Sequence, residues 1–122
     1  MFFRPGLDPH GLARDPFKAL VAPRPIGWIA TLDAEGRANL APYSFFNAVA
    51  EAPPMVAYAS NGEKAGQGGR KDTLANIRAR GEFVANVVPF ALRAAMNATS
   101  APFPPDVDEF AAAGLARLPC RL

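Results

Sequence analysis

Two cations placed before a predicted helix form the first candidate chemical site. Arg70 and Lys71 stand directly before Asp72 and Thr73, behind a stretch with four glycines between positions 61 and 69. The free backbone N–H groups at a helix N-terminus attract anions, and neighbouring cations strengthen that attraction. The Thr73 hydroxyl adds a donor. The spacing predicts a site for a terminal phosphate; the alternative is a solvated loop followed by a capped helix.

A second candidate runs from Asn39 to Asn47, where small polar residues are mixed with aromatic ones between two predicted strands. A flavin ring needs a flat apolar wall and several donors and acceptors for its polar edge. Asn39, Ser44 and Asn47, together with backbone N–H groups, can supply the polar contacts. The alternative is a pair of core strands in which Phe45 and Phe46 alternate sides. Both interpretations hold together if one face packs while an edge binds a ligand.

The only tryptophan, Trp28, marks a third candidate. Gly27 precedes it in a predicted strand, where a glycine allows close approach of a ligand or backbone. The polar Thr31 lies three residues further along. A core position for Trp28 is the competing interpretation, and base rates of burial favour it slightly.

The residue inventory argues against several other kinds of site. One histidine, His10, and one cysteine, Cys120, are too few for a protein-only zinc or iron site. His10 also leaves no Ser-His-Asp arrangement. The carboxylates of Asp106, Asp108 and Glu109 fit a helix start better than an acid-base pair. If the protein is an enzyme, its reactivity would therefore come from a cofactor, and no catalytic side chain is assigned.

Size and charge narrow the class of protein. The chain has 122 residues, half of them hydrophobic, and a net charge of +2. This length predicts a single domain over 1–122. Acidic and basic residues are interleaved, which argues against a nucleic-acid surface, and no apolar run approaches the ~20 residues of a membrane span. A single cysteine predicts a reducing, cytoplasmic setting.

The predicted secondary structure is mainly strand. Thirteen prolines and ten glycines favour short strands and turns. The predicted strands span 26–32, 38–43, 44–50, 55–60 and 82–88, with a turn at 33–36 and a flexible loop at 61–69. Short connections leave no room for parallel crossovers, so we expect an α+β protein built on an antiparallel sheet or barrel.

Helices are predicted between and after the strands. A short helix is predicted over 15–21 with Asp15 as its N-cap. A second helix is predicted over 73–80, directly after the candidate N-cap Asp72, and a third over 90–98.

The inner face of the second helix and the start of the last one are predicted from spacing. Leu74 and Ile77 are expected to face inward. Asp106 and Glu109 are spaced like a variant capping box that opens a short helix ended by Gly114.

Taken together, six segments in order resemble the flavin reductase-like (flavoredoxin-like) family of FMN-binding split β-barrels. The similarity covers about residues 15–122. The segments are RPIGWIAT at 24–31, DAEG at 33–36, NLAPYSFFN at 39–47, the prolines at 53–54, KDT at 71–73 with GEFV at 81–84, and DEF at 108–110.

The resemblance implies an antiparallel split β-barrel with short inserted helices that binds FMN non-covalently at a homodimer interface. The phosphate would lie near Ser60, Arg70, Lys71 and Thr73. The ring would lie along the segment that includes Asn39, Ser44, Phe45 and Asn47, with Trp28 and Thr31 nearby.

The same resemblance implies an oxidoreductase in which NADH or NADPH reduces the flavin. The sequence does not choose between the two donors, and it does not name the electron acceptor, which would be a flavin-dependent monooxygenase or another redox partner. The alternatives are an FMN-holding electron carrier without its own nicotinamide turnover, and an inactive truncated fragment. Family members continue with further barrel strands, so 1–122 is expected to lack its C-terminal strands.

Overall fold

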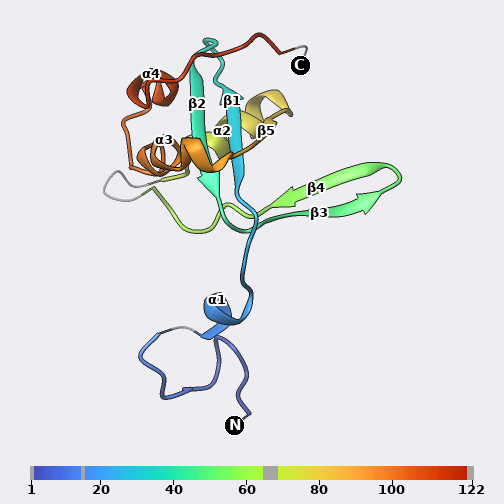
Figure 1. The fold of residues 1–122 in the computed structure, drawn as a ribbon. Helices are drawn as coiled ribbons and strands as arrows, with labels where there is room; N and C mark the ends of the chain where they lie inside the picture. Colours follow the sequence, from blue (N-terminus) through green and yellow to red (C-terminus); the bar gives the residue numbers. More distant parts are fainter. Residues whose placement is uncertain (1, 15, 65–68, 121–122) are drawn as a thin grey trace.

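Two antiparallel sheets form the frame of the protein in a computed structural model that describes residues 2–14, 16–64 and 69–120 (Figure 1). One sheet has three strands in the order β2-β1-β5, and the other is the hairpin β3–β4. The elements are α1 (Pro16–Leu20), β1 (Gly27–Leu32), β2 (Ala38–Tyr43), β3 (Phe46–Glu51), β4 (Pro54–Tyr58), α2 (Asp72–Arg80), β5 (Val84–Val87), a 3-10 turn (Phe90–Leu92), α3 (Arg93–Ala98) and α4 (Glu109–Ala112).

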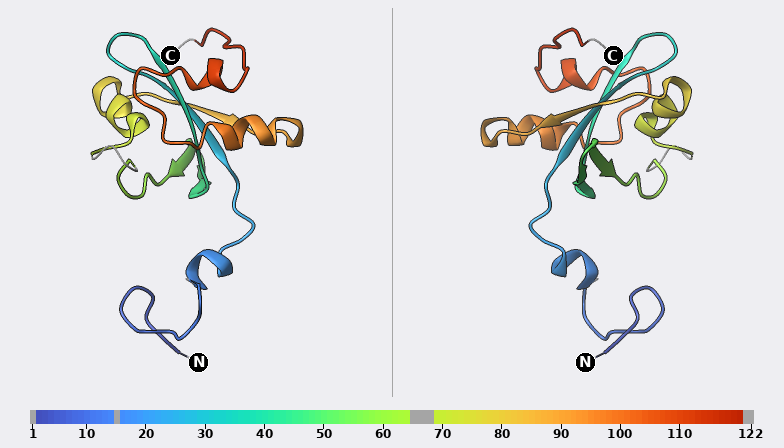
Figure 2. Two further views of the ribbon diagram at one scale, coloured as in Figure 1. Left: turned by 90° about the vertical axis from the view of Figure 1, so that its left-hand side faces the viewer. Right: turned by 90° about the vertical axis from the view of Figure 1, so that its right-hand side faces the viewer.

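The elements divide into a body and two extensions. Helices α2, α3 and α4 gather around the three-stranded sheet, whereas the β3–β4 hairpin projects from it and α1 lies on a separate N-terminal arm (Figures 1 and 2). No closed barrel is formed by the described residues. None of the helices in the described ranges is long and apolar enough to cross a membrane.

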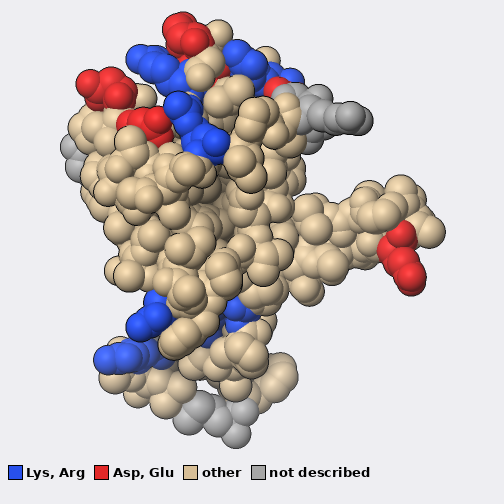
Figure 3. Space-filling model, turned by 45° about the horizontal axis from the view of Figure 1, so that its top comes forward, with Lys and Arg blue, Asp and Glu red and all other residues tan. Residues whose placement is uncertain are grey.

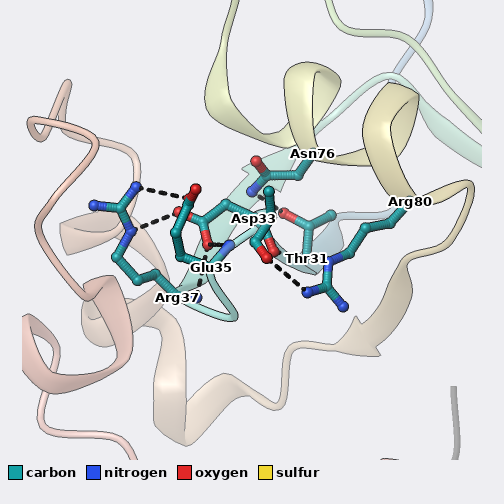
Figure 4. Close-up of polar contacts among 7 residues, drawn as sticks. Thr31, Asp33, Glu35, Arg37, Asn76 and Arg80 are labelled. Atoms are coloured by element: carbon teal, nitrogen blue, oxygen red, sulfur yellow. Dashed lines mark hydrogen bonds and ion pairs between the residues drawn. The ribbon is translucent and has the colours of Figure 1, made fainter.

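The β1–β2 hairpin is the centre of the body. Its register pairs Thr31 with Asn39 and Ala30 with Leu40. The Asp33 side chain organises the turn, because its Oδ1 accepts the backbone N–H groups of Glu35 at 3.0 Å and Arg37 at 2.8 Å (Figure 4). This is an Asx-type turn, in which a short carboxylate replaces a backbone acceptor.

The hydrophobic core lies on these two strands and beneath the helices. Trp28, Ile29, Leu40 and Tyr43 are buried, with Ile29 at 0% and Leu40 at 1% exposure. Burial of such side chains contributes about 1.5–3 kcal/mol each. The core therefore fixes β1 and β2 firmly, and both strands carry candidate site residues.

The strand predictions are confirmed with small shifts at their ends. The turn at 33–36 forms, and the predicted strand 38–43 has the bounds of β2. The predicted strand 44–50 starts two residues late, because Ser44 and Phe45 form the link to the second sheet. Part of the predicted loop at 61–69 lies outside the described residues, as does the predicted cap Asp15.

The predicted start of α2 was wrong in detail. Lys71 occupies the N-cap position and makes no side-chain capping bond, and Asp72 is the first helical residue. The carboxylate of Asp72 is instead ion-paired with Lys64. A lysine across the loop thus outcompetes the helix N–H groups for this carboxylate, because a charged donor makes the stronger hydrogen bond.

The predicted inner face of α2 is only part of the buried face. Thr73 and Asn76 are buried, whereas Leu74 and Ile77 are only half-buried. The reason is that the strands beneath α2 present polar groups of their own. Buried polar groups need hydrogen-bond partners, and α2 supplies them.

The last helix differs from the predicted capping box. Asp108 is the N-cap, and its Oδ1 accepts the N–H groups of Phe110 at 2.9 Å and Ala111 at 3.3 Å. Asp106 is not the cap, and the Glu109 side chain turns inward instead of closing a box. Gly114 follows the helix with φ +68°, as predicted for a C-terminal glycine.

Candidate functional site

A pocket of about 310 Å³ lies between β2, the start of α2 and the segment after α3. Small-molecule sites commonly have volumes of roughly 300–1,000 Å³. Its lining combines cations, carboxylates, hydroxyls and an apolar wall, from Asn39, Ala41, Pro42, Tyr43, Glu63, Lys64, Lys71, Asp72, Thr73, Thr99, Ser100, Ala101, Pro102, Phe103 and Glu109. This mixture suits a ligand that has both a ring and a charged group.

A hydrogen-bonded cluster connects β2 to the start of α2 on one side of this pocket. Asn39 Nδ2 donates to Thr73 Oγ1 at 2.9 Å, and both side chains are buried. The Tyr43 hydroxyl lies beside Thr73 and Ser60. Burial raises the pKa of Tyr43 further above neutral pH, and the protonated hydroxyl can act as a donor.

The two lysines of the pocket differ in their surroundings. Lys64 is 11% exposed and is engaged by Asp72 in a short ion pair. Lys71 Nζ lies 5.7 Å from the centre of the Tyr43 ring, within the range of a cation–π contact. Within the described ranges Lys71 forms no ion pair, which leaves its ammonium group available to an anion.

Glu109 brings a buried carboxyl to the same pocket. Its side chain is 6% exposed, and Oε2 accepts the backbone N–H of Leu40 at 3.2 Å. β2 is an edge strand, so this bond satisfies a donor that no neighbouring strand pairs. Burial is the main cause that raises the pKa of Glu109 above its ordinary value.

Trp28 contributes to the site through another residue. Its Nε1 donates to Thr99 Oγ1 at 2.9 Å, and the Thr99 hydroxyl donates to the backbone oxygen of Met96 at 2.8 Å. Thr99 lines the pocket, while Trp28 is 4% exposed and lies in the core. The indole therefore fixes the Thr99 hydroxyl at the pocket wall.

Thr31 is held in a similar way at the other end of the hairpin. Its Oγ1 accepts the Asn76 side-chain amide at 3.0 Å, and Arg80 Nε donates to the Asp33 backbone oxygen at 2.7 Å (Figure 4). These bonds attach α2 to the β1–β2 hairpin. Thr31 is buried and does not line the pocket.

The link from β2 to β3 packs against the N-terminal arm. The Phe45 ring is stacked on Phe17 with centroids 6.5 Å apart, and the Arg24 guanidinium lies 5.4 Å from the Phe45 centroid. Ser44, next to it, is half-buried, and Asn47 is exposed on β3. Ser44, Phe45 and Asn47 were all predicted site residues, and none of them lines the pocket.

Two members of the predicted phosphate set do not line the pocket. Arg70 is exposed. Ser60 Oγ is buried and has no hydrogen-bond partner of good geometry, although the Tyr43 hydroxyl lies near it. An unsatisfied buried hydroxyl costs about 1–3 kcal/mol, and such a group is one a polar ligand atom can satisfy.

The pocket thus brings together Asn39, Lys71 and Thr73 from the predicted set. Sequence reasoning missed Thr99 and Glu109. No local pattern marked these two residues as site residues, because their partners Trp28 and Leu40 are 71 and 69 residues away in the chain.

Comparison with known proteins gives the family. Residues 20–119 match the flavin reductase like domain. The chain belongs to the flavin reductase-like family. The chain spans about half the length of the curated relatives that it matches.

Solved structures of this family share the fold. Nitrilotriacetate monooxygenase component B from Bacillus cereus is similar at 33% identity and a TM-score of 0.76, over 93% of this chain and 55% of that one. The 2-nitrobenzoate 2-nitroreductase of Pseudomonas fluorescens matches at 34% identity and a TM-score of 0.72, over 90% and 52%. A Shewanella frigidimarina protein with a split barrel domain matches at 26% and 0.65, over 76% and 43%. The antiparallel sheets with short helices are therefore those of a flavin reductase-like split barrel.

Proposed function

We propose that this chain binds FMN in the pocket and serves as a flavin-dependent oxidoreductase reduced by NADH or NADPH. The observation that carries the proposal is the pairing of Lys71 and Thr73 at one side of the pocket with Pro42 and Phe103 in its wall. Lys71 and Thr73 offer a cation and a hydroxyl to a phosphate, and Pro42 and Phe103 offer an apolar surface to a planar ring system. The family supports a flavin as the cofactor.

The residues present fit such a group. The Lys71 ammonium group can donate a charge-assisted hydrogen bond to a phosphate, and the Thr73 hydroxyl can donate a second hydrogen bond. The protonated Tyr43 hydroxyl and the buried Ser60 hydroxyl are two further polar groups on this side. The bound flavin would supply hydride acceptance and electron transfer, while the protein supplies binding and orientation.

A homodimer is part of this proposal. The β3–β4 hairpin exposes Val49 by 59%, Met55 by 48% and Val56 by 45%. On the face shown in Figure 3 the projecting hairpin is almost without charge, apart from an acidic residue near its end. An apolar arm of this kind fits against a second copy of the chain. A monooxygenase partner is proposed by analogy with the Bacillus cereus protein, which is a monooxygenase component.

An electron carrier is the second candidate. The pocket volume of about 310 Å³ is at the lower bound for small-molecule sites, which favours a site that holds one ligand. A protein that holds only the flavin would exchange electrons with a redox partner instead.

Anaerobic mixing with NADH and NADPH separates the two candidates. The chain is loaded with FMN, and the visible absorption of the flavin is followed after each donor is added. Bleaching that is faster than that of free FMN supports the oxidoreductase. An unchanged spectrum with NADH and NADPH, combined with bleaching by dithionite, supports the carrier and contradicts nicotinamide-dependent turnover.

A further inference from the structure

Glu109 lies between the pocket and a second, smaller cavity. The smaller cavity has a volume of about 40 Å³, which is room for about one water molecule. Asn39, Asp72 and Glu109 line both spaces and so form the partition between them. Glu109 is the most buried carboxyl of the partition and is held by the Leu40 N–H.

The side chains that line the larger pocket include more carboxyl groups than ammonium groups, which is unfavourable for binding an anion. Two ammonium groups, Lys64 and Lys71, face three carboxyls, those of Glu63, Asp72 and Glu109. The Lys64–Asp72 ion pair neutralises one group of each sign. Glu63 is exposed to water, which screens its charge. Among the lining groups this leaves Lys71 and Glu109 as charged side chains that are neither ion-paired within the described residues nor exposed.

On the side of the smaller cavity the charged groups are already engaged. Asp33 is paired with Arg37 at 2.6 Å. On α4 itself, Asp108 caps the helix and lies 3.4 Å from Arg117. Glu109 makes no ion pair among the residues that the structure describes. The nearby carboxylate of Asp72 raises the pKa of Glu109, and the nearby ammonium group of Lys64 lowers it.

We propose that Glu109 takes up one proton when a phosphate monoester group occupies the pocket beside Lys71, so that binding of the ligand is coupled to protonation. The inference rests on the proposed flavin site for the identity of the ligand. A carboxylate near the anion would repel it strongly in this buried setting, whereas a carboxylic acid removes the repulsion and gains a donor.

Burial already favours the neutral form of this group, because it raises the pKa of Glu109. An anion nearby raises this pKa further. Between the pKa of the free protein and that of the complex, affinity is expected to fall about tenfold for each unit of rising pH. Below the first value and above the second, the affinity is independent of this group.

Isothermal titration calorimetry tests the coupling. The full chain is titrated with FMN, riboflavin and inorganic phosphate in pairs of buffers that have different ionisation enthalpies, since the difference in heat reports protons taken up. The variant Glu109→Gln keeps an acceptor for Leu40 but cannot titrate. The matched control Glu63→Gln removes an exposed carboxyl from the same pocket.

At a pH between the two pKa values of Glu109, the wild-type chain and E63Q are expected to take up close to one proton more than E109Q with FMN and with phosphate. The phosphate group of the ligand itself titrates in all three proteins, so the difference between them isolates Glu109. Riboflavin is expected to give no such difference. FMN binding without this difference overturns the role of Glu109 and leaves the flavin site standing. The same difference with phosphate alone supports Glu109 but contradicts the flavin proposal. Failure of both phosphate-bearing ligands to bind overturns both.

A second measurement does not depend on a variant that folds. Selective ¹³C labelling of glutamate side-chain carboxyls in the wild-type chain gives one resonance for each of the five glutamates at 35, 51, 63, 82 and 109. Addition of phosphate should move the most buried of these resonances towards the protonated position. An unchanged resonance at saturating phosphate contradicts the proposal.

Discussion

The Asn39 side-chain amide donates to the Thr73 hydroxyl at 2.9 Å across 34 residues of sequence. This single bond connects the polar-aromatic segment after the first hairpin turn to the cation-rich start of α2. The two segments were predicted separately as parts of a flavin site. Their direct contact places Asn39 and Thr73 together in the wall of one pocket.

Replacement of Asn39 by Ala should therefore weaken both the fold and ligand binding. Thr73 is 1% exposed, so the loss of its partner leaves a buried hydroxyl poorly satisfied. The expected loss in free energy of unfolding is about 1–3 kcal/mol, measured by urea denaturation. Asn97→Ala, at an exposed position on α3, is the control and should change stability by less than about 0.5 kcal/mol. Equal effects of the two substitutions would contradict the structural role of Asn39.

Thr99→Val should destabilise the protein although the two side chains have the same shape. Valine cannot accept the Trp28 Nε1–H, and this buried donor would lose its partner at the pocket wall. We expect a loss of about 1–3 kcal/mol and a shifted emission of the only tryptophan. Thr99→Ser keeps the hydroxyl and should preserve the emission wavelength. A valine variant with unchanged stability and emission would show that the hydrogen bond is unimportant.

Gly27→Ala should be costly for a steric reason. A Cβ at this position would lie 2.5 Å from Cδ2 and 2.7 Å from Cγ of Phe46. Phe46 is the first residue of β3, so a shift of its ring that relieves the clash would also move the start of the second sheet. The expected destabilisation is about 1–3 kcal/mol.

A double-mutant cycle identifies Phe46 as the cause of that cost. In a Phe46→Ala background the same Gly27→Ala change should cost much less, with a coupling energy of about 0.5–3 kcal/mol. Additive effects of the two substitutions would mean that the predicted clash is relieved elsewhere.

Lys71→Met should distinguish FMN from riboflavin. The loss of one charge-assisted contact to phosphate costs about 1.5–3 kcal/mol, which is a decrease in FMN affinity of roughly tenfold to a hundredfold. Riboflavin lacks the phosphate, so its affinity should change little. Arg78→Met removes an exposed cation from the far turn of α2 and serves as the control. A loss of riboflavin affinity as large as that of FMN would argue against a phosphate contact.

The fold was predictable where local pattern determines it. The β1–β2 hairpin has a turn residue, Asp33, that makes its bonds within four residues, and the strand after it was predicted with its observed bounds. The inner face of α2 was not predictable in this way. Thr73 and Asn76 are buried because Asn39 and Thr31 pair with them, and apolar periodicity contains no information about such polar partners.

The same distinction applies to the candidate site. Lys71 and Thr73 were found because adjacent residues at a helix start form a local signal. Glu109 was assigned to a helix start, since its actual partner, the N–H of Leu40, lies on a strand 69 residues earlier. A capping interpretation was reasonable from spacing, but the neighbouring Asp108 takes that role and frees Glu109 to turn inward.

Titration of the purified 122-residue chain with FMN tests the central claim most directly. The visible spectrum and flavin fluorescence are recorded together with the mass in solution. We predict stoichiometric binding to a folded dimer, with quenched fluorescence and weaker binding of riboflavin. A folded chain that neither retains FMN on purification nor takes it up at saturating concentration would contradict the assignment of this pocket as a flavin site.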